Sequence, residues 1–223
     1  MLRRRRLTSL PDHLLLSLLL VERGYFFLNG KDLARGMLPK KVLDLINRLD
    51  EAEVDWVLVG AEAINLYLKS PRATVDVDLV VRKKDLRKAK KILKETCVEV
   101  KDSEVHLTGL LSPPPLRLNV DLIKSQSHGL FEEALDRKLD MEGVKAPPVE
   151  ILLALKYLSA SSPSRRRDDK MQDLVDFLRA YRDNRSRIDR ALLIDLASRA
   201  YRNARKDFEK FLDDVDHDRP ITV

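Results

Sequence analysis

The sequence has few of the residues that build disulfide-bonded or zinc-binding proteins. Cys97 is the single cysteine, and the four histidines are scattered along the chain. An internal disulfide and a cysteine-cluster metal site are therefore excluded, and a zinc centre is disfavoured. A single cysteine is also typical of proteins in a reducing compartment, so we expect a cytoplasmic location.

Long apolar runs and aromatic residues are scarce as well. No stretch approaches the roughly 18 apolar residues that a membrane span requires, so we expect no membrane association. Basic residues 3–6 precede an apolar run, residues 14–21, but no small-x-small cleavage site follows it, which makes it a poor secretory signal. Aromatic residues make up only 5% of the chain, so base stacking is not an obvious recognition mode.

Charged residues, in contrast, are abundant. They make up 35% of the chain, and the formal net charge is +6. This balance favours a polyanionic partner such as RNA, although it identifies none.

The stretch with the most chemical content is VDWVLVGAEAINLYLKSPRATVDVDLVV, residues 54–81. In its last strand, apolar residues alternate with Asp76 and Asp78, so both carboxylates leave the same face. At about 4 Å, two like charges repel by roughly 1 kcal/mol in water and about 4 kcal/mol at an effective dielectric of 20. A divalent metal would relieve this cost, whereas the plain alternative is a solvated edge strand.

Gly60 follows an apolar strand and precedes AEAINLYL, which is a good helix former. At such a turn the backbone amides of Gly60 and Ala61 can face an anion, and a phosphate is the natural candidate. The alternative is structural, because strand-to-helix turns often need a residue without a side chain.

A third carboxylate lies in LRLNVDLI, residues 116–123, where Asn119 and Asp121 point away from the apolar face. If this strand pairs with the Asp76 strand, three acids converge. Hard oxygen ligands suit Mg²⁺, which proteins usually share with substrate phosphates. The residues therefore predict a magnesium site that binds a nucleotide.

In this order and spacing, the stretch resembles the nucleotidyltransferase superfamily, most closely its minimal, AbiEii-like toxin branch. The residues that carry the resemblance are Gly60, Ala61, Ala63, Arg72, Thr74, Asp76 and Asp78. The family usually has a second Gly or Ser where this chain has Ala61, so a contact through a serine hydroxyl is absent here.

The family's second block is a helix with a lysine, followed by the pattern R-x-K-D-x-x-D-L. The resemblance assigns Lys156 to that helix and Asp169 and Asp173 to the next, where they share a face at the i, i+4 spacing. The order of Asp169 and Lys170 is inverted relative to the family. Two alternatives stay open: the Lys156 stem crosses the core to reach water, or the acids form a salt-bridged helix pair.

We expect an α/β (α+β) fold, with a small mixed β-sheet flanked by helices and a C-terminal helical bundle. Residues 1–36 would form a basic arm with a helix or strand, residues 37–146 the catalytic core, residues 147–214 the helical domain, and residues 215–223 a tail. A basic helix, residues 84–96, is either a solvated surface or an approach surface for RNA or a nucleotide.

The expected activity is metal-dependent transfer of a nucleoside monophosphate from an NTP to an acceptor hydroxyl. Asp76, Asp78 and Asp121 would bind Mg²⁺ or Mn²⁺, and Asp121 would help to deprotonate the acceptor. The other site residues would hold the nucleotide or offset charge on the leaving pyrophosphate: Gly60, Ala61, Arg72, Thr74, Lys156 and Asp169.

The resemblance further implies an RNA acceptor and a cognate antitoxin protein as partners. The competing hypothesis is a module that keeps the nucleotidyltransferase fold without turnover and binds RNA or a protein partner. Ala61 and the inverted order at Asp169 support this alternative.

Overall fold

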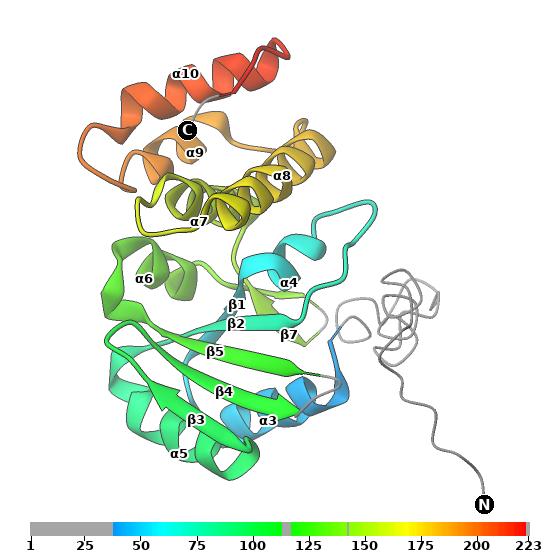
Figure 1. The fold of residues 1–223 in the computed structure, drawn as a ribbon, viewed down its shortest axis with the longest axis vertical. Coiled ribbons are helices and arrows are strands. Elements are labelled where there is room, and N and C mark those ends of the chain that lie inside the picture. Colours follow the sequence, from blue (N-terminus) through cyan, green and yellow to red (C-terminus); the bar gives the residue numbers. More distant parts are fainter. Residues whose placement is uncertain (1–37, 113–116, 142, 222–223) are drawn as a thin grey trace, which may run out of the picture.

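The computed structural model describes residues 38–112, 117–141 and 143–221. The basic arm expected in residues 1–36 lies outside this part of the chain. Figure 1 shows a layered α/β region with a group of helices stacked at one end.

Five strands form the central sheet, in the order β1 (Trp56–Val59), β2 (Asp76–Val81), β5 (Leu118–Lys124), β4 (His106–Ser112) and β3 (Glu99–Asp102). β2 and β5 run parallel, and the other neighbouring pairs are antiparallel. A hairpin of β6 (Leu139–Met141) and β7 (Val144–Ala146) lies beside β1. The outer edge of β1 is thereby covered.

Helices cover both faces of the sheet (Figure 1). On one face, α3 (Lys40–Glu51) packs beside α5 (Leu86–Thr96), which follows the short helix η1 (Lys83–Asp85). α5 turns its apolar residues inward and its lysines outward. It approaches β4 so closely that a Cβ at Gly109 would lie 2.9 Å from Leu93 Cδ1.

The other face carries α4 (Gly60–Asn65) and α6 (Gly129–Asp136), which follows the short helix η2 (Ser125–Ser127). Both contact the nearly apolar helix α7 (Val149–Ser161). The polar residues of β2 and β5 open toward this side, because a Cβ added to Gly60 at the start of α4 would meet Asp78.

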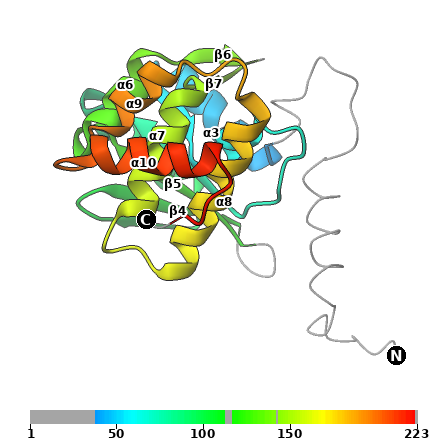
Figure 2. The same cartoon turned by 90° about the horizontal axis from the view of Figure 1, so that it is seen from above.

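Three further helices pack around α7: α8 (Arg167–Asn184), α9 (Arg190–Ala197) and α10 (Ala204–Asp216). Figure 2 shows α10 lying across α7 when the molecule is seen from above. Phe177, Phe208 and Phe211 form the aromatic centre of this bundle. The buried apolar residues of the sheet and of the bundle belong to one contiguous core.

The predicted fold class is confirmed, because a small mixed sheet is flanked by helices and followed by a helical bundle. In the described ranges, no helix has both the length and the apolar character needed to cross a membrane.

Candidate active site

Two aspartates lie side by side at the centre of the sheet. The parallel pairing of β2 and β5 sets Asp78 opposite Asp121 and Asp76 opposite Asn119. Thr108 on β4 donates a 2.5 Å hydrogen bond to Asp121 Oδ1 and holds that carboxylate in place. Burial, reinforced by the negative charge of Asp121, raises the pKa of Asp78 to about 7. Because the two carboxylates are adjacent, a bound cation would relieve the repulsion between them.

Asp76 is oriented differently from this pair. It lies at the exposed start of β2, and its Oδ1 accepts a 2.9 Å hydrogen bond from Asn119 Nδ2. Thr74 makes only local contacts of 3.3 and 3.4 Å with the backbone of Asp76. The structure thus brings Asp78 and Asp121 together, whereas Asp76 lies at the exposed start of β2 and bonds Asn119.

Gly60 connects β1 to α4 in a conformation that requires glycine. Its φ is +69°, and an added Cβ would lie 2.0 Å from Asp78 Oδ2. A side chain is therefore excluded by both the backbone angle and the neighbouring carboxylate. Ala61 occupies the second position of α4.

Lys156 is buried on α7 and held by two aspartates of α8. Its Nζ donates hydrogen bonds of 2.8 Å to Asp173 and of 2.8 Å to Asp176. Ser159 and Arg165 also donate to Asp173, at 2.7 and 2.8 Å. The alternative in which the Lys156 stem merely reaches water does not describe this arrangement, because the ammonium is positioned by specific acceptors.

Arg72 binds the same cluster from the loop before β2. Its guanidinium makes a bidentate ion pair with Asp176, with distances of 2.7 and 2.8 Å, and Asn65 fixes its backbone. Burial alone would raise the pKa of Asp176, but Arg72 and Lys156 outweigh it and hold this pKa below its usual value. Arg72 therefore joins the sheet region to the bundle instead of lining the cleft described next.

A cleft of about 390 Å³ separates the acids from this cationic cluster. Gly60 and Asp78 line one side, and Lys156 and Arg165 line the opposite side. The remaining wall is mainly apolar and comes from β5 and from helices α6 and α7: Ile123, Phe131, Leu152, Leu155 and Leu158. The cleft is thus lined by both charged and apolar side chains.

The structure places Asp169 outside the cleft. Its side chain is one third exposed and pairs with Arg166 at the beginning of α8. The helix instead directs Asp173 and Asp176 toward Lys156. The two acids that meet Lys156 are therefore Asp173 and Asp176, spaced i, i+3, and Asp169 is not one of them.

The donor set fits a hard divalent cation. Asp78 and Asp121 lie opposite each other on neighbouring strands, and carboxylate oxygens are ligands that such a cation prefers. Across the residues that the structure describes, no group of three or more His, Cys, Asp or Glu side chains is arranged to hold a metal ion.

Fold and site together define the nucleotidyltransferase class of proteins. The chain matches the family described as "Nucleotidyl transferase AbiEii toxin, Type IV TA system" over residues 44–221. It therefore belongs to the AbiEii nucleotidyltransferase family, as the sequence motifs predicted.

The chain is also similar in fold to solved structures. The antibiotic-resistance factor ANT(2'')-Ia, in complex with adenylyl-2''-tobramycin, has a TM-score of 0.52 at 12% identity, covering 72% of this chain and 97% of that chain. An antigenic nucleotidyltransferase-like protein from Paracoccidioides brasiliensis has a TM-score of 0.47 at 18% identity, covering 82% and 94%. JHP933 from Helicobacter pylori has a TM-score of 0.49 at 19% identity, covering 80% and 75%. No curated protein matches the chain.

Proposed function

We propose that this protein is a metal-dependent nucleotidyltransferase that transfers a nucleoside monophosphate from an NTP to an acceptor hydroxyl. The observation that carries the proposal is the pairing of Asp78 with Asp121 against the Gly60 turn, across a cleft from Lys156. Carboxylates on one wall and fixed cations on the other suit a metal–triphosphate substrate.

Asp78 and Asp121 would hold Mg²⁺ or Mn²⁺, and Asp76 would join them by turning away from Asn119. The ion supplies positive charge to the triphosphate oxygens. Thr108 uses one acceptor position of Asp121 Oδ1, so the carboxylate keeps positions both for the ion and for the proton of the acceptor hydroxyl. The acceptor oxygen then bonds to the α-phosphorus, and the bond to the β-phosphate oxygen breaks.

Lys156 and Arg165 would neutralise the leaving pyrophosphate. An ammonium has three donors, and Lys156 uses two of them on Asp173 and Asp176. The third is available to a phosphate oxygen in the cleft. Arg165 likewise uses one nitrogen on Asp173 while it lines the cleft. The amides of Gly60 and Ala61 would bind phosphate oxygens from the opposite side.

The apolar side chains that line the cleft would hold the nucleobase. Phe131, Ile123 and Leu155 offer ring and aliphatic surface without hydrogen-bonding groups on their side chains. A base bound by this surface would be selected mainly by size and stacking. We therefore expect weak discrimination among the NTPs by this surface.

RNA is the proposed acceptor, and an antitoxin protein is the proposed partner. The family's description as a type IV toxin–antitoxin system, the net charge of +6 and Arg165 in the lining of the cleft support this assignment. Helix α5 is a less suitable RNA surface, because it covers the sheet face opposite α4 and α7 (Figure 1). A cytoplasmic location remains part of the proposal.

The test incubates purified protein with each α-labelled NTP, Mg²⁺ and either total RNA or lysate protein. The expected result is label in RNA that disappears in the Asp78→Ala and Asp121→Ala variants. Label in protein would reassign the acceptor. Tight RNA binding without transfer, unchanged in both variants, would instead establish the binding module and refute the enzyme.

A further inference from the structure

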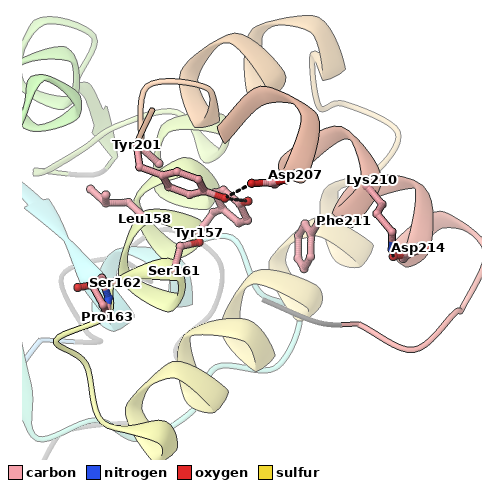
Figure 3. A pocket seen from close by; sticks show the side chains of 11 residues that line it. Tyr157, Leu158, Ser161, Ser162, Pro163, Tyr201, Asp207, Lys210, Phe211 and Asp214 are labelled. Carbon is pink, nitrogen blue, oxygen red and sulfur yellow. Dashed lines mark hydrogen bonds and ion pairs between the residues drawn. The ribbon is translucent and has the colours of Figure 1, made fainter. Parts of the chain in front are cut away.

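A second cavity, larger than the cleft, lies within the helical bundle. Its volume is about 720 Å³, within the usual range for small-molecule sites. The C-terminal half of α7, the connection between α9 and α10, and α10 itself line it, as Figure 3 shows. Leu158 and Ser162 line both the cleft and this bundle cavity, so the end of α7 is the wall between them.

A chain of hydroxyl groups ends on a carboxylate at the rim of the bundle cavity (Figure 3). Tyr201 donates a 3.1 Å hydrogen bond to Asp207, and its hydroxyl lies 2.9 Å from that of Tyr157. Because the Tyr201 proton goes to Asp207, Tyr157 must donate to Tyr201. Burial, together with these two neighbours, raises the pKa of Tyr201, so its hydroxyl stays protonated. Asp207 is therefore the last acceptor of this series of hydroxyl groups.

Asp207 keeps unused capacity to bind a cation. A carboxylate has about four acceptor positions, and the Tyr201 bond uses one. Among the residues with described positions, no lysine, arginine or histidine forms a salt bridge with Asp207. Asp214, the other acid of the cavity, is paired with Lys210 at 2.6 Å and Arg219 at 2.9 Å. The two acids are thus a matched pair, one free to bind a cation and one neutralised.

Aromatic faces and a buried hydroxyl complete the lining. Tyr201 is 39% exposed and stacks on Tyr157 with a centroid distance of 6.2 Å, and Phe211 packs 5.5 Å from Tyr157. Ser161 Oγ is buried near the Tyr157 hydroxyl, yet within the described part of the chain it makes no hydrogen bond of acceptable geometry. Ring faces beside an unpaired carboxylate attract cations, and Ser161 offers a polar contact to a ligand.

We infer that the bundle cavity binds a small organic cation, with its protonated amine between Asp207 and the Tyr201 ring and its apolar body against Phe211 and Leu158. The lining holds two acids and one lysine, so it is negative in a protein of net charge +6. Phosphate-bearing ligands are disfavoured there and favoured in the cleft beside Lys156 and Arg165. The two sides of the α7 end therefore select ligands of opposite charge.

The test uses three probes that share one body and differ in charge: phenethylamine, 2-phenylethanol and phenylacetate. Binding to the full chain, without nucleotide, is measured by titration calorimetry and by saturation-transfer NMR. We expect phenethylamine to bind about tenfold more tightly than the alcohol, and the acid not to bind, because only the amine gains the carboxylate and ring contacts.

Substitutions in the lining of the bundle cavity test where the amine of the probe binds. Asp207→Asn should weaken phenethylamine about tenfold and abolish the preference over the alcohol, whereas the matched variant Asp214→Asn should change the affinity less than threefold. Tyr201→Leu, which keeps apolar bulk but removes the ring, should also weaken binding. Circular dichroism checks that each variant folds.

Three results would overturn the inference: equal affinity for amine and alcohol, no amine binding at millimolar concentration, or loss of amine binding in Asp78→Asn but not in Asp207→Asn. The last result would move the cation to the cleft. Because no nucleotide is present, these outcomes are independent of whether the protein transfers nucleotides.

Discussion

Replacing Asp78 with asparagine should stabilise the metal-free protein while it abolishes nucleotidyl transfer. Asparagine keeps the shape that packs against Gly60 but removes the charge that burial and Asp121 disfavour. The native protein holds a proton on Asp78 up to a pKa of about 7, whereas the unfolded chain releases it near 3.8. The wild type therefore loses stability as the pH rises from about 4 to 7, and the variant does not.

The size of the effect follows from the pKa of Asp78. A rise of about three pKa units corresponds to at most about 4 kcal/mol of penalty above pH 7. Asp78 keeps partial contact with solvent, which screens its charge, so we expect about 2 kcal/mol at pH 8 and less than about 1 kcal/mol at pH 5.

Urea unfolding at pH 5 and pH 8, with and without Mg²⁺, measures this difference. Mg²⁺ should stabilise the wild type at pH 8 and have little effect on Asp78→Asn. Asp76→Asn serves as the control, because Asp76 is exposed on the same strand and its removal should change the free energy of unfolding much less. A metal-free wild type that is more stable than Asp78→Asn at pH 8 would refute the reasoning.

Four further outcomes are expected. Gly60→Ala should lower the free energy of unfolding by about 3 kcal/mol, measured by urea titration, because the new Cβ overlaps the Asp78 carboxylate and φ is positive. Asp176→Ala should cost about 3 to 5 kcal/mol in the same assay, since it leaves Arg72 and Lys156 without their shared acceptor. Asp173→Asn should lower kcat about a hundredfold through a misplaced Lys156, whereas Asp169→Asn should leave kcat within twofold; equal effects would restore Asp169 to the site. Phe131→Ala should raise the KM for each NTP about tenfold without changing the affinity for inorganic tripolyphosphate. If the variant also bound tripolyphosphate more weakly, Phe131 would contact the phosphates and not the base.

The sheet and the position of the acids could be predicted from local rules. Alternation in residues 75–81 fixes the face of Asp76 and Asp78, and the same pattern around Asp121 marks a second strand. Alternation along one strand does not predict which side chain of the neighbouring strand lies opposite each residue. Asp76 bonds Asn119 instead of joining the pair, because the β2–β5 register sets Asn119 opposite it.

The cationic cluster was harder to predict, because tertiary contacts select among several nearby acids. α8 begins at Arg167, and residues 168, 169, 173 and 176 are all aspartates. Asp169 fits the i, i+4 spacing with Asp173, but the face of α8 that meets α7 carries Asp173 and Asp176. The signal that could have found Asp176 is its i, i+3 spacing from Asp173 on a helix next to a buried lysine.

The bidentate bond between Arg72 and Asp176 has a consequence for how this family can diversify. The cation that would meet the substrate is held by an acid that also anchors a loop of the sheet. A recombination event that exchanged the bundle alone would leave Arg72 without its acceptor Asp176 and would also shift Lys156. New specificities are therefore more accessible through changes lining the two cavities than through exchange of whole segments.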